Sequence, residues 1–159
     1  MPRELRIAAV QMDAAPAPTP ARLARATRLA EEAAAAGAQL VVLPELFNIG
    51  YEYSERNHAR AEAADGPALS WMRQTSARLG VHLAGSLLLI DGAEVYNTLF
   101  LTAPNGQSWR YDKNYPWGWE RGYFRGGRWA GLAVIAITLS LAISWLARRS
   151  RIRELHEYR

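Results

Sequence analysis

Lys113 is the only lysine in this chain of 159 residues, because every other basic residue is an arginine. A compact ammonium on a flexible stem can approach a single developing oxyanion or change its pKa, which a planar guanidinium does less readily. A composition so biased towards arginine must also place its last lysine somewhere, so chance is the alternative explanation. The residue type therefore makes Lys113 a candidate catalytic cation.

Glu45 is the second candidate, because it follows Pro44 directly after the apolar run 40–43. Lys113 likewise follows a strand-like run, residues 108–112. In a mostly parallel sheet, residues that follow strand ends can meet in one pocket. A carboxylate and an ammonium in such a pocket could act as a general base and as a cation for an oxyanion. An exposed loop carboxylate is the alternative for Glu45.

The segments up to residue 112 alternate between strand-like and helix-like patterns, which predicts an α/β layered domain. The first strand, helix and second strand imply a parallel pair joined by a right-handed crossover. Thr19 is the expected N-cap of the first helix, which Gly37 ends. We expect strands over 5–11, 40–43, 81–90, 94–101 and 108–112, helices over 20–36 and 65–79, and a weak helix over 54–64. Asp91-Gly92 predicts a hairpin between the third and fourth of these strands, and Asn105-Gly106 predicts a further turn.

The composition is that of a globular domain, since half of the residues are hydrophobic and only 21% are charged. Residues 1–127 carry equal numbers of acidic and basic side chains, so the net charge of +4 resides in residues 128–159. A neutral body with a basic tail does not predict a nucleic-acid partner. The absence of cysteine excludes disulfides and thiolate sites, and the histidines lack metal-site spacing. We expect neither a metal nor a cofactor.

Four motifs occur in a distinctive order: residues 5–13, residues 41–47 with Gly50-Tyr51, Tyr96-Asn97-Thr98, and Tyr111-Asp112-Lys113. In order and spacing they resemble the carbon–nitrogen hydrolase (nitrilase/amidase) family over residues 5–127. The resemblance implies an αββα sandwich. It also implies a Glu-Lys-Cys triad that acts on nitriles, amides or N-carbamoyl compounds.

The resemblance implies roles for three residues. Glu45 matches the general base, and Lys113 matches the lysine that stabilises the tetrahedral intermediate. Glu120 matches a further glutamate that supports the site, although a solvated carboxylate near Arg121 is an equal alternative. The aromatic run 117–124 resembles the substrate-facing loop of some amidase-like members, and ordinary packing would explain it as well.

The nucleophile of the implied triad is missing from this chain. The family places its cysteine in a window that falls here at residues 148–158, and no cysteine is present. Ser150 is the candidate hydroxyl there besides Tyr158, but it has no evident base or elbow. We therefore expect an incomplete sandwich, from a truncated or frame-shifted sequence, that is inactive alone, exposes apolar sheet surface and tends to aggregate.

Residues 129–147 form a stretch without charges, flanked by Arg128 and Arg148. As a helix it would span about 28 Å, close to the roughly 30 Å of a hydrocarbon core. Trp129 and Trp145 stand near its ends, as in an aromatic belt. We expect a transmembrane helix here. The alternation of apolar and small residues towards Trp145 leaves a buried strand open, because the family's next core strand belongs here too.

The chain is thus expected to comprise a partial hydrolase domain (1–127), a membrane helix (129–147) and a basic tail (148–159). Without a recognisable signal peptide the domain would be cytoplasmic and anchored through its C-terminus. The expected ligand is a small amide or nitrile, and intact family members form homo-oligomers. Two alternatives stay open: a membrane-tethered pseudoenzyme or amide-binding module, and a chain that regains activity with a separate cysteine-bearing partner.

Overall fold

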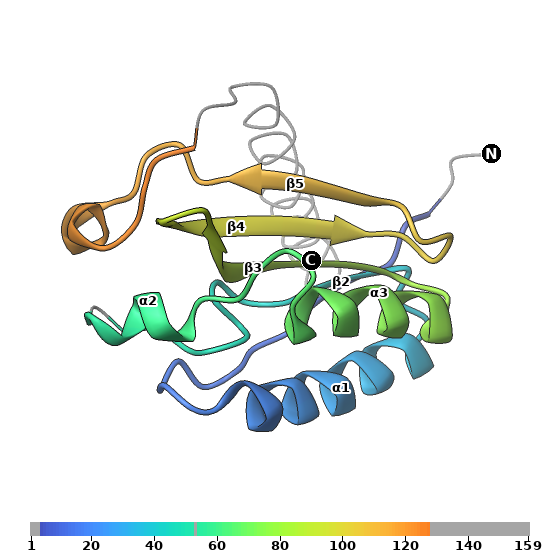
Figure 1. Cartoon of the computed structure of the whole chain (residues 1–159). Helices are drawn as coiled ribbons and strands as arrows, with labels where there is room; N and C mark the ends of the chain where they lie inside the picture. Colours follow the sequence, from blue (N-terminus) through green and yellow to red (C-terminus); the bar gives the residue numbers. More distant parts are fainter. Residues whose placement is uncertain (1–3, 53, 128–159) are drawn as a thin grey trace, which may run out of the picture. The chain divides into compact units, whose positions relative to one another are not determined.

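A computed structural model describes residues 4–52 and 54–127 of the chain. These residues fold into a five-stranded sheet with the strand order β1-β2-β3-β4-β5 (Figure 1). The neighbouring pairs β1–β2 and β2–β3 are parallel, whereas β3–β4 and β4–β5 are antiparallel. The strands are β1 (Ile7–Ala9), β2 (Leu40–Val42), β3 (His82–Asp91), β4 (Glu94–Thr102) and β5 (Ser108–Asp112).

Two long helices cover one face of this sheet (Figure 1). They are α1 (Thr19–Ala35) and α3 (Pro67–Leu79), and the shorter elements are α2 (Arg56–Arg60) and the 3-10 helix η1 (Gly118–Gly122). Small and apolar side chains of the helices meet every second residue of the central strands, as strand periodicity requires. The main core contains Ala26, Leu69 and Met72 from the helices and Leu83, Leu87 and Phe100 from the sheet.

The start of α1 differs from the expectation that Thr19 caps it. Pro18 occupies the N-cap with extended backbone angles, and Thr19 is already the first helical residue. Pro20 fits the first turn because its missing N–H would have no partner within the helix there. The prediction of Thr19 as the cap is therefore wrong, and the end of the helix before Gly37 agrees with the pattern.

The sheet is mixed, with the parallel first pair and the Asp91-Gly92 hairpin that the sequence predicts. Two successive reversals, at β4 and β5, make β5 run in the same direction as β3 and β2. The carboxyl ends of β2, β3 and β5 therefore still meet at one edge of the sheet. Residues that follow β2 and β5 can therefore meet in one pocket, although the sheet is mixed and not mostly parallel.

A second, smaller core lies beside this edge. Leu46 and Ile49 from the turn after β2 pack with Leu88 of β3 and Val95 of β4, and Phe124 closes the cluster from the segment after η1. All five side chains are buried. This small core joins the segment that carries Glu45 to the segment that carries Glu120.

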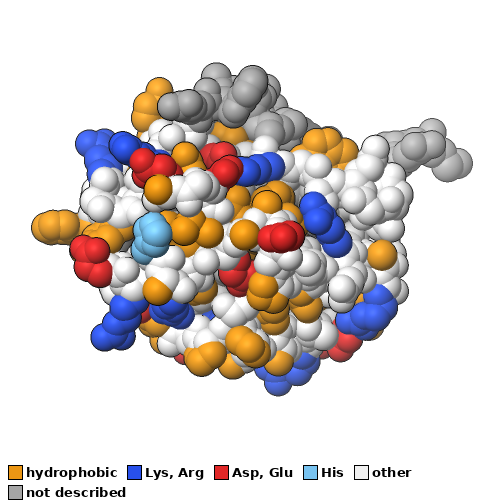
Figure 2. Space-filling view, in the orientation of Figure 1, with side chains coloured by type: hydrophobic (Ala, Val, Ile, Leu, Met, Phe, Trp, Pro, Cys, Tyr) orange, Lys and Arg blue, Asp and Glu red, His pale blue; other side chains and the backbone are white. Residues whose placement is uncertain are grey.

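Acidic and basic side chains are interspersed on the face shown in Figure 2, consistent with the balanced charge of the body. Within residues 4–52 and 54–127 there is no helix with the length and hydropathy needed to cross a bilayer. The expected membrane helix over 129–147, the basic tail and Ser150 lie outside the described residues.

Candidate active site

Three polar side chains converge at the edge of the sheet where β2 and β5 end. Glu45 follows β2, Lys113 follows β5, and Glu120 lies in η1. The backbone N–H of Lys113 donates to the carbonyl of Asn97 at 2.9 Å, which ties the end of β5 to β4. The sequence-predicted residues are therefore brought together, and their catalytic roles remain predictions.

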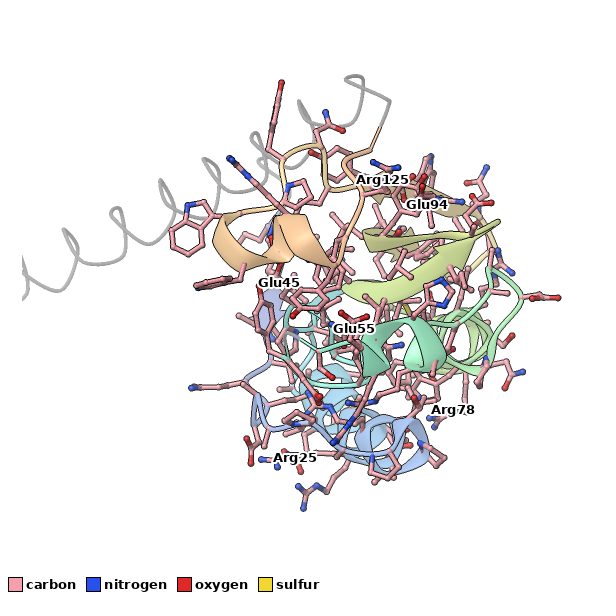
Figure 3. All side chains as sticks on the ribbon, turned by 60° about the vertical axis from the view of Figure 1, so that its left-hand side comes forward. Arg25, Glu45, Glu55, Arg78, Glu94 and Arg125 are labelled. Atoms are coloured by element: carbon pink, nitrogen blue, oxygen red, sulfur yellow. The ribbon has the colours of Figure 1, made fainter. Side chains whose placement is uncertain are left out.

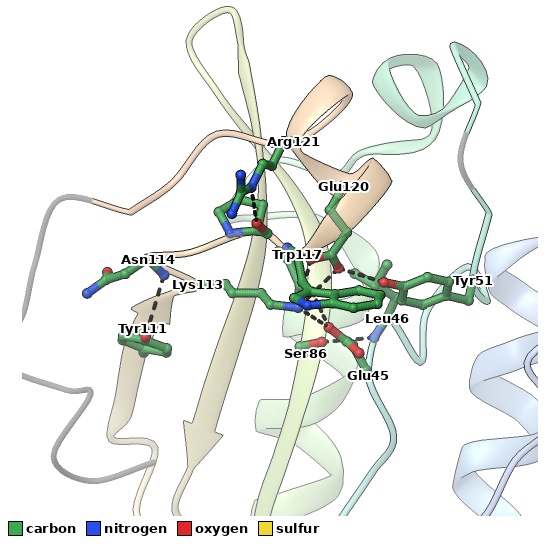
Figure 4. Close-up of polar contacts among 12 residues, drawn as sticks. Glu45, Leu46, Tyr51, Ser86, Tyr111, Lys113, Asn114, Trp117, Glu120 and Arg121 are labelled. Carbon is green, nitrogen blue, oxygen red and sulfur yellow. Dashed lines mark hydrogen bonds and ion pairs between the residues drawn. The ribbon is translucent and has the colours of Figure 1, made fainter. Parts of the chain in front are cut away.

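Lys113 lies between two carboxylates (Figure 4). Its Nζ is 3.0 Å from Oε1 of Glu45, and it is 2.8 Å and 3.1 Å from Oε2 and Oε1 of Glu120. Partial burial acts to lower the pKa of Lys113, but its hydrogen bonds to Glu120 and Glu45 outweigh burial and raise it. The ammonium is therefore charged over the physiological pH range.

Glu120 is the buried member of the group, with 1% of its side chain exposed. Its Oε1 accepts a hydrogen bond from the Tyr51 hydroxyl at 2.6 Å, and its Oε2 accepts one from the backbone N–H of Trp117 at 2.7 Å. Burial acts to raise the pKa of Glu120, whereas the hydrogen bonds from Lys113, Tyr51 and Trp117 prevail and lower it. The alternative of a solvated loop carboxylate does not hold for this residue.

Glu45 is more accessible, with 45% of its side chain exposed. It lies near the η1 segment in the turned view (Figure 3). The side-chain amide of Asn97 donates to its Oε1 at 2.6 Å, so this oxygen receives hydrogen bonds from both Asn97 and Lys113. An exposed, oriented carboxylate beside an ammonium is suited to accept a proton from a bound molecule.

The turn after β2 holds Glu45 in place through its neighbour, Leu46. Leu46 has a φ of 48°, a left-handed conformation that is unfavourable for a bulky residue. Its N–H donates to the Ser86 hydroxyl at 2.8 Å, and its carbonyl accepts bonds from Ile49 and Gly50. These bonds and the burial of Leu46 keep the turn in this conformation, and such strain is frequent at functional sites.

A cavity of about 250 Å³ opens between Glu45 and Lys113. Its walls combine apolar side chains with the two charged site residues and three further residues that carry polar groups, and the volume suits a small molecule. The lining residues are Leu43, Glu45, Ser86, Asn97, Leu99, Tyr111 and Lys113.

The segment after Lys113 returns to the sheet as a closed loop. The N–H of Gly127 donates to the Lys113 carbonyl at 3.0 Å, and the N–H of Arg125 donates to the Val95 carbonyl at 2.8 Å. A side chain at residue 127 would collide with the backbone of Asp112, so the close return requires glycine. This loop carries η1 and places Glu120 over Lys113.

The aromatic residues at the tip of this loop point to solvent. Tyr115, Trp117 and Trp119 are 86%, 77% and 79% exposed, whereas Phe124 belongs to the small core. None of the three exposed aromatics lines the cavity beside Lys113. The alternative of ordinary packing thus holds for Phe124 and not for these three rings, and a substrate-facing role stays a prediction.

Sequence reasoning did not assign roles to three residues that shape the site. Asn97 and Tyr51 lie in the motifs that carried the resemblance, so their positions were marked but their contacts were not foreseen. Ser86 lies inside an apolar strand, and its isolated hydroxyl among Leu and Gly was the signal available. Within the described part of the chain, no cluster of His, Asp or Glu is arranged to hold a metal ion.

A family model for carbon-nitrogen hydrolases matches residues 6–145. The match begins near the residue expected from the motifs and extends past residue 127, through most of the 129–147 segment. That extent supports assigning 129–145 to the hydrolase domain. The predicted boundary at 127 is therefore earlier than the end of the family match.

Individual relatives agree with this match. A nitrilase from Pyrococcus abyssi is 29% identical over 126 residues, which cover 77% of this chain and 48% of the relative. A 2-oxoglutaramate amidase from Bacillus subtilis is 38% identical over 72 residues, which cover 44% of this chain and 27% of the relative.

Solved structures give the same picture. A CN-hydrolase superfamily protein from Xanthomonas campestris matches with a TM-score of 0.69 and 31% identity over 79% of this chain and 48% of its own. An amidase from Nesterenkonia sp. AN1 matches with a TM-score of 0.70 and 31% identity over 79% and 51%. The chain thus spans about half the length of these relatives. Sequence, fold and the extent of the family match together make this chain a member of the carbon–nitrogen hydrolase family.

Proposed function

We propose that Glu45, Lys113 and Glu120 form the base and cation half of a carbon–nitrogen hydrolase site, and that the cavity beside them binds a small amide or nitrile. The observation that carries this proposal is the position of Lys113 between two carboxylates at the cavity. The family match and the amidases among the relatives support the substrate class.

Each side chain has a task in this proposal. Glu45 is exposed and oriented, so it accepts a proton from an attacking group and returns it to the leaving nitrogen. Lys113 stabilises the negative charge that develops on the substrate oxygen or nitrogen. Glu120 is buried against Lys113 and keeps it protonated, because the buried carboxylate stabilises the charged amine.

We further propose that these 159 residues give no turnover by themselves. Covalent hydrolysis through this triad needs a thiolate to attack the substrate carbon, and the chain contains no cysteine. A base and a cation can bind and polarise an amide without cleaving it. A cysteine-bearing partner chain would have to supply the thiol for hydrolysis to occur.

Butyramide, which binds a variant of the Nesterenkonia amidase, is a suitable probe. Because Lys113 is the only lysine, isotope-labelled lysine gives a single side-chain NMR signal from beside the cavity. We expect butyramide to shift this signal saturably. Leu99→Trp should abolish the shift by filling the cavity, while Leu101→Trp, two residues along the same strand and outside the lining, should preserve it.

A signal that butyramide leaves unchanged, or shifts equally in the Leu99→Trp variant, would contradict the binding proposal. Ammonia release from butyramide tests turnover separately. We expect no release above that of Glu45→Gln, and release that depends on Glu45 would disprove the proposed inactivity.

Membrane attachment through residues 129–147 also stays a proposal, with the hydrolase-domain assignment of 129–145 as its competitor. Fractionation of cells that express the chain separates the two. An anchored chain stays with membranes after a carbonate wash, and a chain ended after Arg128 moves to the supernatant.

A further inference from the structure

Asn97 is the residue that contacts both Glu45 and Lys113 from a single position on the sheet. Its side-chain amide donates to Glu45 Oε1 at 2.6 Å, and its backbone carbonyl accepts from the Lys113 N–H at 2.9 Å. The residue is 3% exposed and lies in β4, paired with Leu88 of β3. A side chain fixed in the middle of a sheet has little freedom to move with its partners.

The two contacts act on different parts of the site. The backbone bond fixes where β5 ends, and so determines where the Lys113 side chain begins. The side-chain bond fixes one oxygen of Glu45, which otherwise is largely exposed and belongs to a turn rather than to a strand. Without a second donor, an exposed carboxylate of this kind pairs only weakly with an ammonium.

The donor is also neutral. Lys113 faces Glu45 and Glu120 directly and Tyr51 through Glu120, and Tyr111 lines the same cavity. The Asn97 amide therefore orients the carboxylate without adding a second positive charge beside it.

We propose that Asn97 is a positioning residue that holds Glu45 against Lys113. This inference rests on the proposed function for its meaning in catalysis, and on the hydrogen bonds alone for its geometry. Asn97 does not touch the substrate in this account, because it acts through Glu45.

The sole lysine makes a direct test possible. Acetic anhydride acetylates neutral amines, so the rate at Lys113 rises when its pKa falls and when Glu45 no longer covers it. Mass spectrometry reads this rate against the N-terminal amine as an internal reference. We expect Asn97→Leu to raise the rate at Lys113 several-fold, as Glu45→Gln does, because both release Lys113 from Glu45.

A double-mutant cycle separates positioning from a general structural effect. If Asn97 acts through Glu45, Asn97→Leu adds nothing to the rate in the Glu45→Gln background. Thr102→Val, a nearly isosteric change at another buried position of β4, should leave the rate at Lys113 unchanged. If Asn97→Leu does not fold, Asn97→Ser gives the same test, because its hydroxyl is too short to replace the amide.

Two results would overturn the proposal: an unchanged rate in the Asn97 variants, or an increase of equal size with and without Glu45. The cycle is measured without a ligand, so its outcome is independent of butyramide binding. If Asn97→Leu adds nothing in the Glu45→Gln background and butyramide does not bind, the proposed function is refuted and the positioning role of Asn97 stands.

Discussion

Lys113 is shared by two carboxylates that differ in their surroundings. Glu120 is buried and receives three kinds of donor, whereas Glu45 is nearly half exposed and receives two. A buried, multiply bonded carboxylate is a fixed counter-charge, and an exposed one is available to exchange a proton. The difference in environment assigns separate tasks to two side chains of the same type.

Removal of Glu120 should destabilise the domain strongly. Glu120→Ala removes the buried carboxylate that accepts hydrogen bonds from the Tyr51 hydroxyl and the Trp117 N–H, and it takes a partner from Lys113. We expect a loss of about 3 kcal/mol in the free energy of unfolding, measured by urea denaturation. Glu94→Ala is the control, since its ion pair with Arg125 is exposed (Figure 3) and should contribute under about 1 kcal/mol.

The ion pair between Lys113 and Glu120 predicts how the free energy of unfolding depends on pH. The pKa of Glu120 is lowered from its ordinary 4.5, so its contribution is full above pH 4.5 and is lost as the pH falls through the lowered pKa. The pKa of Lys113 is raised from 10.5, so its contribution is full below pH 10.5 and is lost above the raised pKa. Urea unfolding from neutral to acid pH should show a smaller loss of stability for Glu120→Gln than for the native chain. Equal losses in the two proteins would contradict the assignment.

At the scale of elements, the site depends on a turn that a single hydroxyl supports. The hydroxyl of Ser86 in β3 accepts a hydrogen bond from the N–H of Leu46, the residue next to Glu45. The turn conformation is unfavourable in isolation, so its supporting contacts determine whether it forms.

Ser86→Ala should therefore cost more than the loss of an ordinary hydroxyl. The change leaves the buried N–H of Leu46 unpaired, and we expect a loss of about 1–3 kcal/mol in the free energy of unfolding. Ser70→Ala, whose hydroxyl makes a long and exposed bond, should change it by less than about 0.5 kcal/mol. Similar effects at both positions would show that the bond to Leu46 does not support the turn.

The sequence predicted the elements well where local pattern determines them. The strand 108–112 and the helix beginning at Pro67 follow from alternation, Pro and Gly, which act over a few residues. The reversal between β3 and β4 was likewise predicted, because the Asp91-Gly92 turn is a local signal. The burial of Glu120 was undecidable from local pattern, since it requires a loop whose return at Gly127 is a tertiary contact.

At the scale of the molecule, the sheet carries helices on one face and leaves polar site residues and large aromatics outside the main core. Leu5 and Trp109 are 58% and 42% exposed, in addition to the aromatics of the loop tip. Exposed apolar groups of this size favour association. The matched region covers about half the length of the relatives.

We expect the purified chain to self-associate through exposed aromatics. The double variant Tyr115→Ser/Trp119→Ser should lower the concentration dependence of sedimentation, because it removes two of the most exposed rings. Its free energy of unfolding should change by no more than about 0.5 kcal/mol, since neither ring belongs to a core. Undiminished association in this variant would place the contact elsewhere.

The closed loop between Lys113 and Gly127 has a consequence for how such a site can diversify. Its ends are bonded to the sheet, and the backbone of Trp117 helps to hold Glu120 over the lysine, while the side chains of Trp117 and Trp119 are exposed. Exchanges of these two side chains would leave the charged group intact. The surface that this loop presents at its tip can thus change while the ion pair between Lys113 and Glu120 at its base stays the same.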